Sequence, residues 1–170
     1  MPTAPTPYNK SMSTEYYEDI KLHQKYRSRE YRLTEKEIID YAQKWDPQPF
    51  HIDPEFAKNT KFGGLVASGS HLLAICLKME GEKRPRRAWI AAMGLDKIGF
   101  LTPARPGDIL VFENELISRR ESESDSNAGI VHFAAKLINQ RDEPVLTYEG
   151  VALLEKRPAK GIHSSESGAR

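Results

Sequence analysis

Residues 70–79 carry apolar side chains around nearly the whole surface of a helix, and this feature most limits how the chain can fold. A helix that is apolar on all sides has to be buried on most of its surface. Gly81 follows at the position where a glycine commonly ends a helix. The chain must therefore supply a large apolar surface elsewhere to cover this one helix.

Four later segments have the length and composition of β-strands. They are residues 88–95, 109–118, 130–138 and 145–154. Short polar segments separate them, and successive strands joined by short turns form an antiparallel sheet. One buried helix followed by such a sheet predicts an α+β domain with the helix packed on one face of the sheet.

The length of 170 residues is typical of one domain. Residues 1–13 and 158–170 are rich in small and polar residues and lack any hydrophobic pattern, so we interpret them as mobile tails. Residues 14–157 then form a single domain. Within it, residues 16–32 mix aromatic and charged side chains and are expected to form an irregular strand or clasp.

The charge balance excludes some classes of partner. The chain has 25 basic and 24 acidic residues and a net charge of +1, which gives no case for a nucleic acid or a membrane surface. Cys76 cannot form an intrachain disulfide, no segment is apolar over a bilayer's thickness, and no secretory signal is visible. We expect a soluble cytoplasmic protein.

A first helix is predicted to begin after Thr34. Thr34 and Glu37 have the spacing of a capping box, in which each side chain bonds the backbone of the other residue. The apolar positions that follow fall on one helical face: Ile38, Ile39, Ala42 and Trp45. Pro47 requires the helix to end near Trp45.

Residues 46–51 are expected to form a restrained, non-helical loop, because Pro47 and Pro49 each force the preceding residue toward extended geometry. Asp46 and His51 lie on this loop and can converge on one point. A carboxylate beside an imidazole can orient a water, take its proton and return a proton nearby. The alternative is that Asp46 caps a turn and His51 packs in the core.

Asp53 precedes Pro54 and an acidic residue, which is the pattern of a helix start. We therefore assign Asp53 to capping a short helix rather than to chemistry. The segment Phe62-Gly63-Gly64 interrupts the helical pattern after it.

Ser68 and Gly69 open the apolar helix. The N-terminus of a helix presents free N–H groups and a positive dipole end, and a glycine lets a ligand approach the backbone. This arrangement suits an oxyanion. The alternative is that Ser68 is a simple N-cap and Gly69 allows close packing on the sheet. His71, in the first turn, is expected to line or pack this pocket rather than to react.

Several kinds of site are not indicated. The five histidines show no paired ligand spacing, so we predict no metal, and no glycine-rich phosphate loop is present. Cys76 lies among apolar residues and is a poor candidate for a nucleophile. The basic residues of segment 83–87 are interpreted as a solvated loop, and Arg105 as structural.

The chain resembles the MaoC-like dehydratase family, which includes the (R)-specific enoyl-CoA hydratases, over about residues 15–155. The catalytic motif of that family reads Gly-Asp-x-Asn-Pro-x-His. The corresponding residues here are Trp45-Asp46-Pro47-Gln48-Pro49-Phe50-His51. Phe62-Gly63-Gly64 through Gly69 matches the segment leading into the family's central helix, and Arg105-Pro106-Gly107-Asp108 matches a turn before a long strand.

The resemblance implies a hot dog fold, in which an antiparallel sheet wraps a long central helix. It implies a homodimer or higher homo-oligomer with the acyl pocket near the subunit interface, an acyl-CoA thioester as substrate, and no cofactor. Carried over by position, Asp46 and His51 would activate a water that adds to a 2-enoyl-CoA. The N–H near Gly69 would hold the thioester oxygen.

Two departures from the family motif bear on specificity. Trp45 replaces the motif glycine and Gln48 replaces its asparagine, so both are expected to contact or reshape the substrate pocket. Gly69 is followed by Ser70 and His71 rather than by an apolar pair. These changes keep the acid–base pair and leave the acyl group open. A hot dog thioesterase and a non-catalytic acyl-CoA-binding subunit are the alternative functions.

Overall fold

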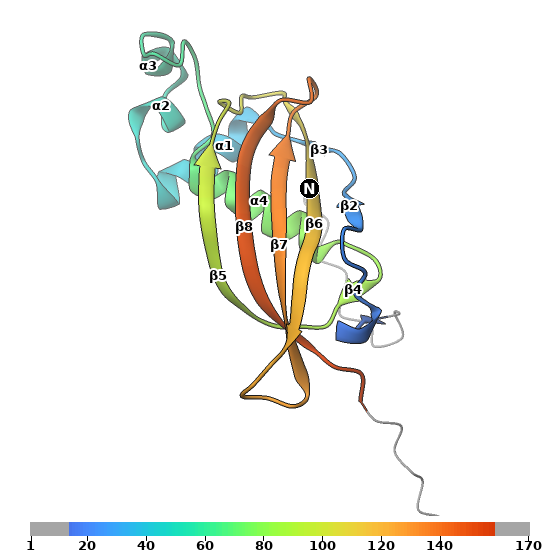
Figure 1. Ribbon diagram of the computed structural model, residues 1–170. Coiled ribbons are helices and arrows are strands. Elements are labelled where there is room, and N and C mark those ends of the chain that lie inside the picture. The colour runs from blue at the N-terminus through green and yellow to red at the C-terminus, as the bar shows by residue number, and fades with distance from the viewer. Residues whose placement is uncertain (1–13, 159–170) are drawn as a thin grey trace, which may run out of the picture.

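The computed structural model describes residues 14–158, so the two predicted tails lie outside it apart from Pro158. Helices cover one face and one end of a twisted antiparallel sheet (Figure 1). The helical elements are η1 Tyr17–Asp19, α1 Glu35–Trp45, α2 Pro49–Ile52, α3 Pro54–Lys58 and α4 Gly69–Gly81. The strands are β1 Thr14–Glu15, β2 Lys25–Arg27, β3 Tyr31–Arg32, β4 Arg86–Arg87, β5 Trp89–Phe100, β6 Ile109–Glu121, β7 Ala128–Ile138 and β8 Pro144–Glu155.

The main sheet has the strand order β2-β6-β7-β8-β5, and β3 also pairs with β6. All of these pairings are antiparallel, as predicted. The four long strands extend beyond the predicted bounds. β6 continues into the polar segment that follows Ser118, because its backbone still pairs with β7 as far as Glu121 opposite Gly129. Backbone hydrogen bonding therefore outlasts the apolar side-chain pattern.

α4 lies across one face of this sheet (Figure 1). Its buried side chains pack against residues of β6, β7 and β8 in one hydrophobic core, which confirms the α+β prediction. The buried core residues of α4 are Leu72, Ile75, Cys76 and Met79. The prediction that α4 is buried on most sides is wrong for this chain, since Ala74 is exposed and Leu77 is 58% exposed. The sheet of one chain covers only one side of the helix.

α1 begins as predicted, because the Thr34 hydroxyl accepts a hydrogen bond from the N–H of Glu37 at 3.2 Å. Ile38 and Ala42 are buried on the expected face. Trp45 is not, and is 64% exposed. It is the last residue of α1, so its ring extends past the packed face and meets the Lys44 ammonium at 4.8 Å.

The prediction of a wholly non-helical loop over residues 46–51 is wrong in part. Pro49 starts the short helix α2, because a proline is tolerated at the first helical position, where no N–H donor is required. His51 therefore lies on a helical turn. The next helix, α3, confirms the assignment of Asp53, whose Oδ1 accepts from the N–H groups of Glu55 and Phe56 at 2.9 and 3.1 Å.

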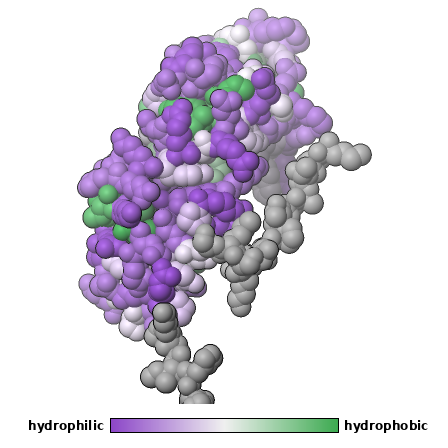
Figure 2. Space-filling view, turned by 90° about the vertical axis from the view of Figure 1, so that its right-hand side faces the viewer, coloured by the Kyte–Doolittle hydropathy of each residue, from purple (hydrophilic) through white to green (hydrophobic). Residues whose placement is uncertain are grey.

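The two edges of the sheet, formed by β2 and β5, differ in how much apolar surface they expose. The side that carries β2 is mostly hydrophilic, with small hydrophobic areas (Figure 2). At the opposite edge, β5 pairs with β8 alone within residues 14–158. This strand and the residue after it expose large apolar side chains: Ile90, Met93, Ile98, Phe100 and Leu101.

No helix in the described residues is long and apolar enough to cross a membrane.

The basic segment 83–87 is not the solvated loop that we predicted. Arg87 is buried, with Nε 3.1 Å from Glu15 Oε2 and Nη1 3.0 Å from Glu80 Oε1. Lys83 is also buried, and its ammonium lies 2.8 Å from Glu15. These ion pairs join the N-terminal strand β1 to the end of α4. The basic sequence pattern did not indicate that Lys83 and Arg87 pair with Glu15, which lies far away in the sequence.

Replacing Arg87 with methionine should lower the free energy of unfolding by about 3–5 kcal/mol, because the partly buried Glu80 carboxylate loses its ion-pair partner and Glu15 keeps only Lys83. Urea denaturation of the two proteins measures the difference. Arg120→Met is the matched control: Arg120 is exposed and lies 3.9 Å from an exposed glutamate, so its removal should cost less than about 1 kcal/mol. Equal effects of the two substitutions would contradict the structural role of Arg87.

Candidate active site

Asp46 and His51 come together at the junction of α1 and α2. The distance from Asp46 Oδ2 to His51 Nε2 is 3.7 Å. The His51 side chain is 9% exposed and the Asp46 side chain 33% exposed, so the carboxylate lies on the solvent side of the imidazole. The backbone between them is tight, because Gln48 N–H donates to the Asp46 carbonyl and His51 N–H donates to the Gln48 carbonyl, both at 2.8 Å.

The other imidazole nitrogen fixes the orientation of His51. Nδ1 lies 2.7 Å from the carbonyl oxygen of Val66. A carbonyl can only accept, so Nδ1 carries the proton, and in the neutral ring Nε2 has a free lone pair. Nε2 and the Asp46 carboxylate then present two acceptors to one point. Such a pair can hold a water through both of its hydrogens and remove one of them.

His51 lines an apolar cavity of about 290 Å³. The cavity is formed by segments that are distant in sequence: α2, the start of α4, the end of β5 with the loop after it, and β8. Its lining residues are Phe50, His51, Phe62, Val66, Ala67, Gly69, Leu72, Phe100, Leu101, Thr102, Pro103, Ala104 and Val145. Of the residues predicted from sequence, His51 and Gly69 lie in this lining.

Gly69 is the first residue of α4 and contacts an aromatic ring. A Cβ atom built on Gly69 would lie 2.5 Å from Cε1 and Cζ of Phe100, so only glycine allows this approach. Ser68 is the N-cap and is 1% exposed. Its hydroxyl makes no capping bond and lies 2.8 Å from the Ser70 hydroxyl instead. The first N–H groups of α4 therefore keep their capacity to bind an oxygen.

The other five predicted site residues lie outside this cavity lining: Asp46, Ser68, Trp45, Gln48 and His71. Trp45 and Gln48 are exposed. His71 is buried between α1 and α4, where its ring stacks on Tyr41 at 4.4 Å and its Nε2 lies 3.4 Å from Glu37 Oε1. The structure therefore brings Asp46, His51 and Gly69 to one region and separates His71 from it.

The contacts of Glu37 differ from those that its sequence position predicts. The capping-box spacing predicts that its carboxylate turns back to the backbone of Thr34, but it instead accepts from the Tyr31 hydroxyl and faces His71. Burial acts to raise its pKa, while hydrogen bonds from His71 and Tyr31 act in the opposite direction and leave the pKa of Glu37 lowered. No local signal reveals this, because the partners lie on β3 and α4.

Three of the cavity-lining residues that the sequence did not indicate are aromatic: Phe50, Phe62 and Phe100. Phe50 packs edge-on against the His51 ring at 4.5 Å, and Phe62 packs against Phe50 at 5.2 Å. Phe62 is near enough in sequence to be suspected, but Phe100 is not, since nothing local connects it to Gly69.

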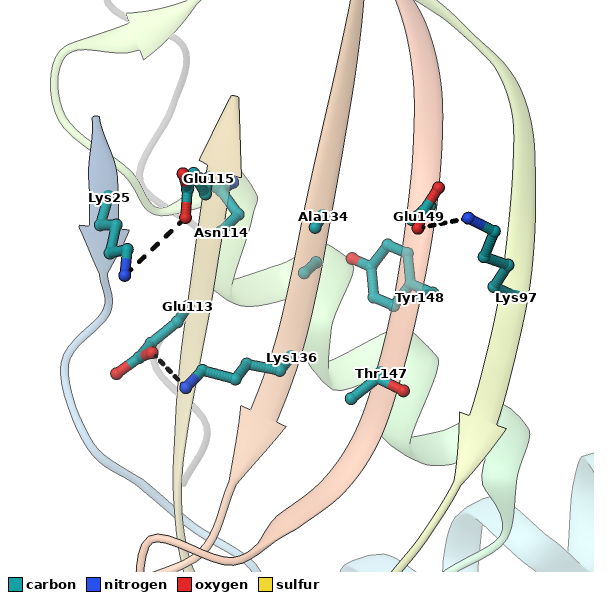
Figure 3. A pocket seen from close by; sticks show the side chains of 11 residues that line it. Lys25, Lys97, Glu113, Asn114, Glu115, Ala134, Lys136, Thr147, Tyr148 and Glu149 are labelled. Carbon is teal, nitrogen blue, oxygen red and sulfur yellow. Dashed lines mark hydrogen bonds and ion pairs between the residues drawn. The ribbon is translucent and has the colours of Figure 1, made fainter. Parts of the chain in front are cut away.

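A larger hollow of about 490 Å³ lies on the sheet, and its charged side chains project from the strands (Figure 3). These charges pair with one another: Lys97 with Glu149 at 2.8 Å, Lys136 with Glu113 at 2.9 Å, and Lys25 with Glu115 at 3.8 Å. The hollow contains no histidine or cysteine. Among residues 14–158, no three His, Cys, Asp or Glu side chains converge to hold a metal ion.

Comparison with known proteins gives a consistent result. Residues 19–134 match the family described as MaoC like domain. The crystal structure of a MaoC-like dehydratase from Rhodospirillum rubrum has a TM-score of 0.80 and 32% identity, over 85% of this chain and 99% of that one. An (R)-hydratase from A. caviae involved in PHA biosynthesis has a TM-score of 0.66 and 26% identity, over 82% and 98%.

A relative of uncharacterized function, YdeM of Bacillus subtilis, is 27% identical over 142 residues, which are 82% of this chain and 98% of the relative. The structural similarity confirms the predicted α+β hot dog fold.

Replacing Glu37 with glutamine should destabilise the protein at pH 7 by about 1–3 kcal/mol, because His71 and Tyr31 lose an ionised partner. The pKa of Glu37 is lower in the folded than in the unfolded protein. Its stabilisation is therefore present above pH 4.5 and is lost as the pH falls through the folded pKa. Chemical denaturation at several pH values should show wild type and variant converging in acid. Glu35→Gln, at an exposed position of α1, is the control, and a constant difference for Glu37→Gln would contradict the assignment.

Proposed function

The chain belongs to the MaoC-like dehydratase family, and on this premise we propose that it catalyses reversible addition of water to a 2-enoyl-CoA, giving a 3-hydroxyacyl-CoA. The observation that carries the proposal is the 3.7 Å approach of Asp46 to His51 at the wall of an apolar cavity that also contains Gly69. The (R)-hydratase from A. caviae, to which the chain is similar, supports the same reaction class.

In the proposed mechanism, a water donates its hydrogens to Asp46 and to Nε2 of His51. One of these groups removes a proton while the water oxygen forms a bond to C3 of the enoyl thioester. The electron pair of the double bond moves toward the thioester carbonyl, and C2 then takes a proton from the acid–base pair. Dehydration runs through the same steps in reverse.

The negative charge that develops on the thioester oxygen requires a donor. The start of α4 supplies backbone N–H groups and a positive dipole end next to the cavity. Phe100 packs directly on Gly69, so we expect its ring to move or to form part of the binding surface when the thioester binds. The apolar lining favours a hydrocarbon acyl group.

The alternative functions make different products. A thioesterase releases free thiol from acyl-CoA, whereas a hydratase changes the mass of the acyl-CoA by one water. A non-catalytic subunit binds acyl-CoA without either change. Mass spectrometry and a thiol assay over a panel of acyl-CoA substrates distinguish the three. Thiol release as the main reaction would contradict the proposal.

Asp46→Asn and His51→Ala should each lower kcat for hydration of the best enoyl-CoA by about 10²–10⁴, because each removes a proton-transfer group. Loss of enoyl-thioester absorbance measures the rate. Asp40→Asn and His132→Ala change the same residue types at exposed positions and should leave the rate unchanged. Full activity of both site variants would contradict the mechanism.

We also propose a homodimer in which β5 joins its copy. β5 is a long edge strand with exposed apolar side chains, and such an edge is a template for pairing with another chain. Phe100 and Leu101 lie at this edge and also line the cavity. The cavity would then adjoin the subunit interface.

The double variant Met93→Lys/Ile98→Lys should be monomeric, because dimerisation would bring four added charges to an apolar interface. Sedimentation velocity distinguishes monomer from dimer. Ile117→Lys alters an exposed apolar residue of β6 and should remain dimeric. A monomeric wild-type protein, or a dimeric double variant, would contradict the interface.

We also propose a reducing, cytoplasmic location, supported by the state of Cys76. This residue is free and buried on α4. Burial raises the pKa of its thiol to about 12, so it has little thiolate character and suits a structural role.

A further inference from the structure

Phe62 is held by hydrogen bonds on both sides of its backbone. Its N–H donates to the Thr60 hydroxyl at 3.2 Å. Its carbonyl oxygen accepts from Nη2 of Arg105, which lies 43 residues away in the loop between β5 and β6. The first bond is local, and the bond from Arg105 ties the segment after α3 to the loop between β5 and β6.

Arg105 is itself anchored at its backbone. Its N–H donates to Asp108 Oδ2 at 2.7 Å, and Asp108 Oδ1 accepts from the amide of Gln140 at 2.9 Å. Within residues 14–158, the Arg105 guanidinium has no carboxylate within ion-pair distance. The contact with Phe62 is therefore the interaction that accounts for its position.

The segment that Arg105 contacts contains two successive glycines, Gly63 and Gly64, with positive φ angles. Gly63 has φ +64° and Gly64 has φ +157°, which are conformations that other residues rarely adopt. A Cβ built on Gly64 would lie 3.3 Å from Nη1 of Arg105, so the guanidinium rests on this glycine. Two successive glycines would let Phe62 move away unless a contact of this kind held it.

The ring of Phe62 continues this contact toward the catalytic pair. It packs on Phe50, which packs in turn on the imidazole of His51. All three rings line the 290 Å³ cavity. The apolar wall beside His51 therefore includes Phe62, the residue whose carbonyl Arg105 binds.

We propose that Arg105 is a positioning residue that holds Phe62 against Phe50 and thereby limits the length of the acyl group accepted beside His51. This inference rests on the proposed hydratase function. It assigns Arg105 a role in substrate selection that acts through Phe62, without contact between Arg105 and the reacting atoms.

The test compares kcat/KM for butenoyl-, hexenoyl- and decenoyl-CoA. Arg105→Met keeps the length of the side chain and removes its donors, so it should raise the ratio of decenoyl to butenoyl kcat/KM by about tenfold, the scale of specificity set by a methylene or two in an apolar pocket. Phe62→Ala should shift the ratio in the same direction. The double variant should add little to either, because both changes release the same wall.

Arg105→Lys keeps one charged donor and should restore much of the wild-type ratio. Arg120→Met, at an exposed position at the end of β6, should not alter it. An equal loss of activity for all chain lengths in Arg105→Met, or a Phe62→Ala shift that simply adds to the Arg105→Met shift, would overturn the proposal.

Hydrogen exchange separates this proposal from the proposed function. The amides of residues 60–66 should exchange faster in Arg105→Met than in wild type, whether or not the enzyme turns over. If wild type hydrates no enoyl-CoA, the proposed function fails and the limit on acyl length fails with it. If wild type is active but exchange and chain-length ratio are unchanged in Arg105→Met, the positioning role alone fails.

Discussion

The hydrogen bond between His51 Nδ1 and the carbonyl of Val66 is the interaction on which the candidate site depends. It selects the tautomer, turns Nε2 toward Asp46, and joins α2 to the segment before α4. Without this hydrogen bond, the Asp46 carboxylate and the His51 imidazole would still be close, but neither the tautomer nor the orientation of the ring would be fixed. Since Val66 is nearly fully buried, the bond is sheltered from water and holds the ring in one orientation.

The cavity beside this imidazole is formed from parts that do not belong to one element. The N-terminus of α4 supplies backbone donors, β5 supplies Phe100, and the glycine segment after α3 supplies Phe62. Hydrogen bonds bridge these parts, such as the one from the N–H of Ala67 to the carbonyl of Ala104 at 2.9 Å. Under the proposed function, changes in these loop contacts would alter substrate selection while Asp46 and His51 stay in place.

Local rules predicted much of the fold and part of the candidate site. The caps at Thr34 and Asp53 and the four long strands followed from sequence patterns, since each depends on residues a few positions apart. The same rules erred at Trp45, at α2 and at Arg87. Trp45 is exposed because it lies at the end of its helix, and α2 forms because a proline is tolerated at the first helical position. Arg87 is buried because a carboxylate distant in sequence pairs with it.

The sequence by itself determined the α+β class and placed Asp46, His51 and Gly69 in one stretch, because periodicity, prolines and glycines act on the backbone near them. Only the tertiary structure decided that His51 bonds a carbonyl 15 residues away and that Arg105 reaches a carbonyl 43 residues away. Such contacts have no sequence period. They arise when the sheet and α4 pack and bring separate loops to one end of the molecule.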